Sequence, residues 1–164
     1  MQFYSTNRKT SPVSLCEAVV RGLAADRGLF MPEVIRRFPP AFYQNMKEMT
    51  LREISFVVAE AFFGEDVEAG KLKEIVDETL NFDIPLVQVA DNRYSLELFH
   101  GPTLAFKDVG ARFMARLLAY FNKQEGERQV NVLVATSGDT GSAVANGFLD
   151  VPGVKVFVLY PQGK

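Results

Sequence analysis

Two apolar runs in the C-terminal half constrain the fold more than any other feature of the sequence. Residues 130–135 read VNVLVA and residues 155–160 read KVFVLY, with a helix-length segment and a Pro-Gly turn between them. Continuous apolar runs joined by a helical crossover are typical of a parallel β-α-β unit whose strands are buried on both faces. A doubly wound sheet needs several such strands, so we expect an α/β domain that is incomplete at residue 164.

The first half of the chain, residues 1–85, carries mostly helical signals. Amphipathic patterns follow Ser14 and Thr50, both suitable N-cap residues, and a third pattern covers residues 71–82. Between the first two patterns, a glycine and three prolines predict an ordered but irregular segment. We therefore expect a helical region over residues 1–85, followed by the α/β domain over residues 86–164.

Residues 85–100 alternate between apolar and polar side chains and contain an Asp-Asn turn signal. This pattern predicts a hairpin or two short strands at the start of the second part. A long helix is expected over residues 104–121, with Thr103 as its N-cap and an i,i+4 pair between Asp108 and Arg112.

The composition excludes several classes of protein. Hydrophobic residues make up 48% of the chain, charged residues 23%, and the net charge is -2, so neither a disordered chain nor a nucleic-acid-binding protein is expected. A single cysteine, Cys16, rules out an intrachain disulfide framework and a multi-cysteine metal site. The first residues lack the apolar run of a signal peptide, and no stretch is long enough to span a membrane. We expect a cytoplasmic protein without a metal site.

The loop TSGDTGS, residues 136–142, follows the first apolar run, where ligands bind in open α/β sheets. Its hydroxyls, its glycines and the free N–H groups of the next helix suit a carboxylate or a phosphate. In a simpler interpretation, Asp139 or Thr140 only caps the helix and the glycines only turn the chain. The string D-T-G-S also occurs in aspartic proteases, but a helix follows it here and the chain has a single copy.

Lys107 stands in the first turn of the predicted long helix, where the helix dipole repels a cation. Its helical neighbours Gly110, Ala111 and Met114 are small or apolar. Both features favour a neutral amine, which is the form that Schiff-base chemistry with an aldehyde cofactor requires. The alternative is an ordinary exposed lysine paired with Asp108 or Glu97.

The motifs FHGPTLAFKD, ATSGDTGSAVA and VFVLYPQGK, together with GLAADRGLFMPE near the N-terminus, resemble those of the threonine synthase family. The resemblance covers essentially the whole chain. It implies a fold type II enzyme dependent on pyridoxal 5′-phosphate, with this chain as an N-terminal fragment. It also implies that the contacts to the cofactor's phosphate and pyridine nitrogen lie beyond Lys164, so we expect the fragment alone to be inactive.

The resemblance also assigns roles to individual residues. Lys107 matches the lysine that binds the cofactor as a Schiff base, and Phe106 and Asp139 match residues beside the cofactor. Asp139 stands where many relatives have asparagine, and its carboxylate could influence the proton near the cofactor's phenolic oxygen. The loop that holds the substrate's α-carboxylate matches Thr136, Ser137, Gly138, Asp139, Thr140 and Gly141. His100 and Arg112 could lie near the substrate's phosphate, although a structural role is the stronger interpretation for both.

The implied reaction of the full-length enzyme is a β,γ-replacement, in which O-phospho-L-homoserine and water give L-threonine and phosphate as the last step of threonine biosynthesis. This makes the expected partner a small-molecule substrate, and leaves open whether the protein is a monomer or a homodimer. Two alternatives remain at this point. One is another fold type II enzyme, such as a threonine or serine dehydratase. The other is a non-catalytic binding module.

Overall fold

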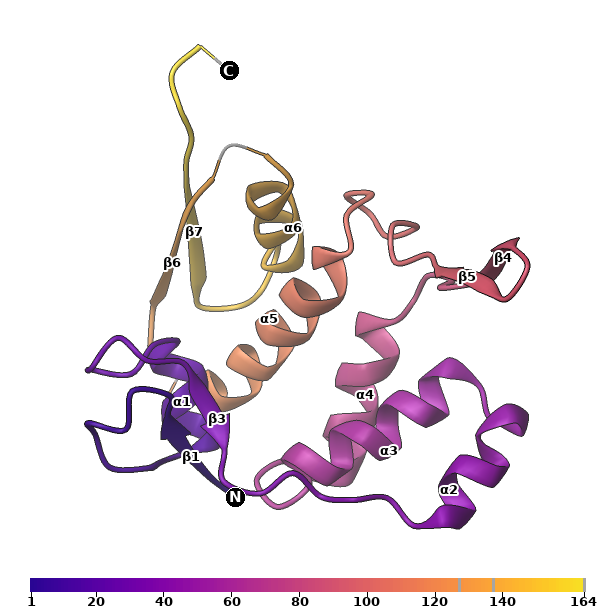
Figure 1. Ribbon diagram of the computed structural model, residues 1–164. Helices are drawn as coiled ribbons and strands as arrows, with labels where there is room; N and C mark the ends of the chain where they lie inside the picture. Colours follow the sequence, from indigo (N-terminus) through magenta and orange to yellow (C-terminus); the bar gives the residue numbers. More distant parts are fainter. Residues whose placement is uncertain (127, 137, 164) are drawn as a thin grey trace. The chain divides into compact units, whose positions relative to one another are not determined.

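The structure is a computed structural model that describes residues 1–126, 128–136 and 138–163. The chain divides into two compact units, Met1–Asp77 and Glu78–Lys164, which Figure 1 shows in sequence colours. Each unit has its own short elements and its own buried side chains. In the described part of the chain, no helix is long and apolar enough to cross a membrane.

The first unit contains a small antiparallel sheet that the sequence patterns did not predict. Strand β1 (Gln2–Ser5) lies between β2 (Val13–Ser14) and β3 (Phe30–Pro32). Ser5 at the end of β1 is fully buried and donates its hydroxyl hydrogen to Asp26. A Cβ at Gly28 would lie 2.0 Å from Ser5 Oγ, so glycine is required where this loop passes the strand.

The helices of the first unit begin largely where the sequence predicts. Helix α1 (Leu15–Arg21) is capped by Ser14, and α3 (Leu51–Phe63) by Thr50, whose capping box with Glu53 is complete. Helix α4 spans Ala69–Thr79, so its last two residues belong to the second unit. The segment expected to be irregular also forms a helix, α2 (Pro40–Asn45), and a 3-10 turn η1 (Met46–Glu48). Proline suits the first position of α2 because that position needs no N–H donor.

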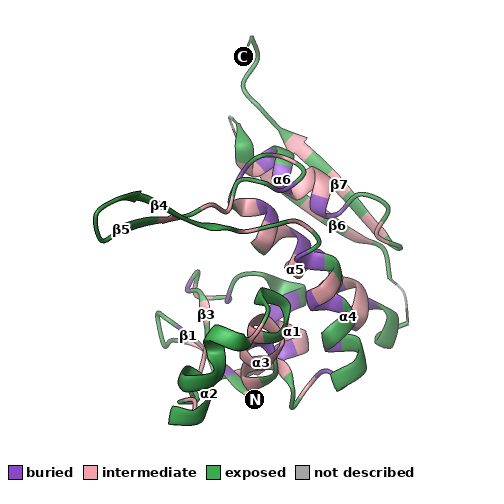
Figure 2. Cartoon of the chain, turned by 90° about the vertical axis from the view of Figure 1, so that its right-hand side faces the viewer, coloured by how far each residue is buried: buried purple, intermediate pink, exposed green. Residues whose placement is uncertain are grey.

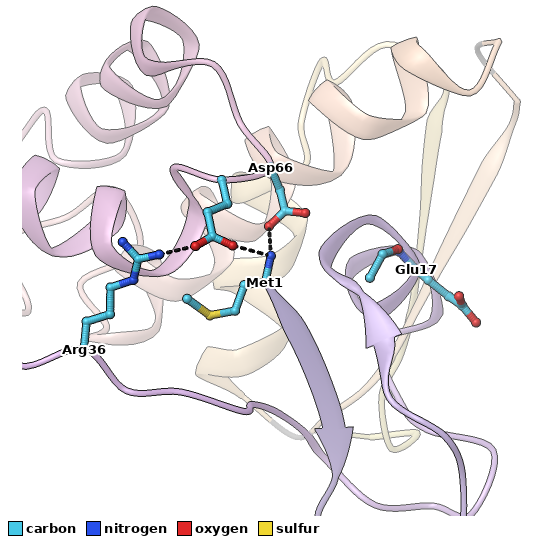
Figure 3. A network of polar contacts seen from close by, with 6 residues as sticks. Met1, Glu17, Arg36 and Asp66 are labelled. Carbon is cyan, nitrogen blue, oxygen red and sulfur yellow. Dashed lines mark hydrogen bonds and ion pairs between the residues drawn. The ribbon is translucent and has the colours of Figure 1, made fainter.

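The N-terminal amine of Met1 belongs to a network of charges within the first unit (Figure 3). It donates to Asp66 at 3.0 Å and forms an ion pair with Glu65 at 2.9 Å, and Arg36 pairs with the other oxygen of Glu65. The hydrogen bond to Glu65, followed by that to Asp66, raises the pKa of the Met1 amine. The network therefore links the residue before β1 to Glu65 and Asp66, which follow α3.

The second unit begins with the predicted hairpin, formed by β4 (Leu86–Ala90) and β5 (Arg93–Leu96). Asn92 in the turn has a φ of 56°, a conformation that asparagine tolerates better than most residues. Figure 2 shows that most of this hairpin is exposed.

The predicted parallel β-α-β unit is also present. Strands β6 (Val130–Ala135) and β7 (Val154–Leu159) pair in parallel from Val130–Val154 to Ala135–Leu159, and α6 (Asp139–Gly147) connects them (Figure 1). The expectation that both faces of these strands are buried is wrong for this chain. Alternate residues are exposed, so Leu133, Phe157 and Leu159 are respectively 69%, 49% and 58% accessible. The covering helix lies on one face only.

Helix α5 (Lys107–Gln124) contributes the buried apolar side chains of Ala115, Leu117, Leu118 and Phe121 to the core of the second unit. The expected pair between Asp108 and Arg112 is replaced by other contacts. Arg112 is buried and donates to the backbone carbonyls of Glu78, at 2.6 Å, and Thr79, at 3.2 Å. Arginine satisfies helix-terminal carbonyls well because its guanidinium has several donors in a fixed geometry.

Candidate functional site

The site is built around the start of α5, where Lys107 is the first helical residue. The predicted helix start at residue 104 and the predicted cap at Thr103 are both wrong. Leu104 has a φ of 57°, outside the helical region, and Phe106 occupies the N-cap position without a side-chain cap. Lys107 nevertheless lies in the first turn, as the sequence predicts.

Asp108 holds the loop that precedes the lysine. Its carboxyl group is fully buried and accepts two hydrogen bonds from Thr103, one from the backbone N–H at 2.8 Å and one from the hydroxyl. A Cβ at Gly101 would lie 2.5 Å from Asp108 Oδ2 and 2.9 Å from the ring of Phe82. Only glycine therefore fits at this position. The loop is therefore packed onto the residue next to Lys107.

The second part of the site is the loop between β6 and α6. Thr136 follows β6, and its hydroxyl accepts a hydrogen bond from the N–H of Gly138 at 3.2 Å. Ser137, which the sequence places in the same loop, lies outside the described residues. Gly138 is the N-cap of α6 without a side-chain cap, and Asp139 is the first helical residue. Neither Asp139 nor Thr140 is therefore the N-cap residue, although Asp139 Oδ1 accepts a hydrogen bond from the N–H of Thr140 at 3.1 Å.

The two glycines of this loop differ in their surroundings. A Cβ at Gly141 would lie 2.3 Å from Thr136 Cγ2 and 3.2 Å from Val158 Cγ1, so this glycine lets α6 pack closely against the ends of both strands. A Cβ at Gly138 would have no neighbour within 4 Å. The backbone of Gly138 therefore borders open space, next to the start of a helix whose N–H groups favour anions.

Lys107 and Asp139 bring the two parts together. Lys107 Nζ lies 2.8 Å from Asp139 Oδ2, and the side chains are 32% and 59% accessible. The hydrogen bond from Lys107 lowers the pKa of Asp139. Lys107 Nζ also lies 4.5 Å from the centre of the Phe106 ring, within range of a cation–π interaction.

The acidic partners that the sequence suggested for Lys107 are engaged elsewhere. Asp108 accepts from Thr103, and Glu97 lies 2.7 Å from His100 Nε2. The His100 ring also stacks on Phe99, with 4.9 Å between the ring centroids. Arg112 is buried and bonded to backbone carbonyls, which agrees with the structural role favoured for it.

Sequence reasoning identified Lys107 and Asp139 separately but missed their contact. They are 32 residues apart, and each begins a helix of the second unit. The sequence feature that could have indicated the contact is the pair of glycine-containing loops that precede α5 and α6. Asp108 was missed as the anchor of the loop, because a buried aspartate next to a lysine has the same pattern as an ordinary exposed pair.

The side chains of the site suit one kind of chemistry best. They combine a partly exposed primary amine, a carboxylate beside it and a helix start with open backbone at Gly138. Among the residues that the structure describes, no group of three or more His, Cys, Asp or Glu side chains could hold a metal ion. The amine suits an aldehyde, and the helix start suits a separate anion such as a carboxylate.

Comparisons with known proteins point to one family. Residues 2–80 match the family model described as threonine synthase N terminus. Over all of its length the chain is 42% identical to threonine synthase of Serratia marcescens and 40% identical to that of Escherichia coli, and it spans 38% of each relative. The yeast relative from Saccharomyces cerevisiae is 38% identical over 99% of the chain, which covers 36% of that protein.

Solved structures show the same likeness. The crystal structure of threonine synthase from Escherichia coli matches with a TM-score of 0.89 at 40% identity, over 100% of this chain and 38% of that one. The crystal structure of PLP-bound threonine synthase from Brucella melitensis matches with a TM-score of 0.92 at 35% identity, over 99% of this chain and 36% of that one. The chain thus spans little more than a third of the length of the proteins that it resembles.

Proposed function

Because this chain belongs to the threonine synthase family, we propose that it forms the part of a pyridoxal 5′-phosphate-dependent lyase that carries the cofactor-binding lysine. The proposed activity of the full-length protein converts O-phospho-L-homoserine and water to L-threonine and phosphate. The observation that supports it most is the contact of Lys107 Nζ with Asp139 at the starts of α5 and α6.

The described residues fit the reactive end of that cofactor. Lys107 offers the amine that its aldehyde requires, Phe106 lies against that amine, and Asp139 supplies a carboxylate beside it. When bound, the cofactor supplies an electron sink that makes carbanions at the substrate accessible. We assign to the Lys107 amine the transfer of protons at the substrate's carbon atoms.

The β6–α6 loop has the properties of a carboxylate site. We assign the substrate's α-carboxylate to Thr136, Gly138, Asp139, Thr140, Gly141 and the undescribed Ser137. The open backbone at Gly138 and the positive end of the α6 helix dipole support this assignment. Asp139 would also influence the proton near the cofactor's phenolic oxygen. An unchanged visible spectrum and pH profile in Asp139→Asn would contradict that role.

The remaining assignments rest on the same resemblance. We propose that residues 1–85 form the family's N-terminal helical region and that residues 86–164 form the first part of the cofactor-binding domain. The proposed cellular location is the cytoplasm. A chain with one cysteine, which cannot form an intrachain disulfide bond, agrees with this proposal.

Product analysis of the protein at its full encoded length tests this function. With pyridoxal 5′-phosphate and O-phospho-L-homoserine, we expect threonine and inorganic phosphate in equal amounts. Lys107→Ala should abolish turnover, whereas Lys123→Ala, which removes a lysine from the last turn of the same helix, should retain it. Release of ammonia from threonine or serine without release of phosphate would indicate a dehydratase instead. Failure to bind the cofactor would indicate a non-catalytic module.

A further inference from the structure

The ion pair between Lys107 and Asp139 has an unusual setting for a partly exposed pair. Most such pairs contribute little to stability, because water screens the charges and two side chains lose freedom. Here the two residues begin neighbouring helices, α5 and α6, whose backbones are held in place by close packing (Figure 1). The position of one charge relative to the other is therefore set by the fold.

Close contacts hold α6 at both of its ends. At its start, Gly141 lies against Thr136 and Val158, with no room for a Cβ. At its end, a Cβ at Gly147 would lie 2.9 Å from the backbone carbon of Ala111 in α5. Both contacts require the two helices and the strand ends to keep a fixed spacing, which fixes the backbone of Asp139 relative to α5.

The backbone of Lys107 is held by its neighbour. Asp108 is buried and bonded twice to Thr103, so the first turn of α5 cannot rotate without breaking those bonds. The lysine side chain itself has four rotatable bonds, and within residues 1–126, 128–136 and 138–163 it contacts the Phe106 ring and Asp139. Asp139 is therefore a charged group that favours one conformation of the amine.

We propose that Asp139 is a positioning residue, whose carboxylate holds Lys107 Nζ at the starts of α5 and α6 before the cofactor's aldehyde arrives. The inference rests on the proposed function and adds a role for Asp139 in the cofactor-free protein. Capture joins Lys107 Nζ to the aldehyde carbon and releases the aldehyde oxygen as water, after the ammonium of the ion pair has lost one proton, which the Asp139 carboxylate can accept. An amine already held at the reaction site loses less freedom in this step, so covalent capture is faster.

The test measures two quantities on the full-length protein without cofactor. One is the rate of pyridoxal 5′-phosphate capture at Lys107, followed by borohydride reduction and peptide mapping. The other is the affinity for pyridoxine 5′-phosphate, an analogue with an alcohol in place of the aldehyde. In Asp139→Asn we expect capture to slow about tenfold while analogue affinity stays within about twofold, because the amide still forms hydrogen bonds but has lost its charge. Asp139→Glu should restore part of the rate.

Glu78→Gln is a matched control. It removes a carboxylate that is 62% accessible and lies 2.7 Å from Arg116 in the same unit, and it should leave capture unchanged. A capture rate in Asp139→Asn equal to or above the wild-type rate would overturn the positioning role. Equal losses of capture and analogue affinity would also overturn it, because they indicate a general structural effect. Absence of any adduct on Lys107 in the wild-type protein would instead contradict the proposed function itself.

Discussion

Thr103 donates two hydrogen bonds to the buried carboxyl group of Asp108, one from its backbone and one from its hydroxyl. Thr103→Val keeps the shape of the side chain and removes the hydroxyl, which leaves one oxygen of a buried acid without its partner. We expect the free energy of unfolding to fall by about 1–3 kcal/mol in urea titrations.

Thr79 provides the control for this substitution in the same unit. Among the described residues its hydroxyl is buried without a hydrogen-bond partner, so Thr79→Val should change the free energy of unfolding by less than about 0.5 kcal/mol or increase it. Equal losses in the two variants would contradict the assigned role of Thr103.

Gly141→Ala tests the packing that places Asp139. The new methyl group would meet Thr136 Cγ2 at 2.3 Å, so α6 must move away from the strand ends. We expect a loss of about 1–3 kcal/mol in the free energy of unfolding. Gly110→Ala inserts the same methyl group into α5, where nothing lies within 4 Å, and should stabilise by about 0.5–1 kcal/mol. Tolerance of alanine at both positions would show that the close approach of α6 is not required.

The network at Met1 makes the stability of the first unit depend on pH. The pKa of the Met1 amine is raised above 8.0, so its stabilising contribution is complete below that pH and is lost as the pH rises through the folded-state pKa. The pKa of Glu65 is lowered from 4.5, first by the hydrogen bond to the amine, so its contribution is complete above that pH and is lost as the pH falls through the folded-state pKa.

Thermal unfolding of Glu65→Gln across pH measures this coupling. The melting temperature of Glu65→Gln should lie furthest below that of wild type at pH values where the Glu65 carboxyl and the Met1 amine are both charged. The difference should become smaller at lower pH, where the carboxyl is protonated, and at higher pH, where the amine loses its proton. Glu48→Gln is the control, because Glu48 lies 3.7 Å from Lys47 with both side chains highly exposed, and its effect should be near zero throughout. A decrease that is constant with pH would contradict the ion pair between Glu65 and the amine.

The exposed face of β6 and β7 predicts how the 164-residue chain behaves alone. Leu133, Phe157 and Leu159 form an apolar surface of a kind that promotes association. We expect the chain to self-associate with rising concentration in sedimentation experiments, and Leu133→Ser to reduce this association. We also expect the chain alone to bind the cofactor weakly or not at all, and to show no turnover. Leu117→Ser, at a buried position, should instead unfold the unit. A monomeric chain that holds the cofactor stably would contradict this prediction.

The features predictable from the sequence are those set by local physics. Ser14 and Thr50 cap their helices because their hydroxyls accept from N–H groups three residues on, a relationship visible in the chain order. The hairpin of residues 86–96 and the parallel pair of strands follow from alternation and from the length of the crossover.

The features that escaped prediction depend on distant parts of the chain. The sheet of β1, β2 and β3 pairs strands of two to four residues, which are too short to give a periodic pattern. Thr103 was expected to cap α5, but the left-handed conformation of Leu104 delays the helix and directs Thr103 to Asp108. The contact of Lys107 with Asp139 arises only when α5 and α6 pack together.

The most direct test of the account is the location of the cofactor on the full-length protein. After incubation with pyridoxal 5′-phosphate and reduction with borohydride, peptide mapping should find one pyridoxyl group per chain, on Lys107, and none in Lys107→Ala. An adduct spread over several lysines, or one that persists in Lys107→Ala, would contradict the assignment of Lys107 as the cofactor-binding residue.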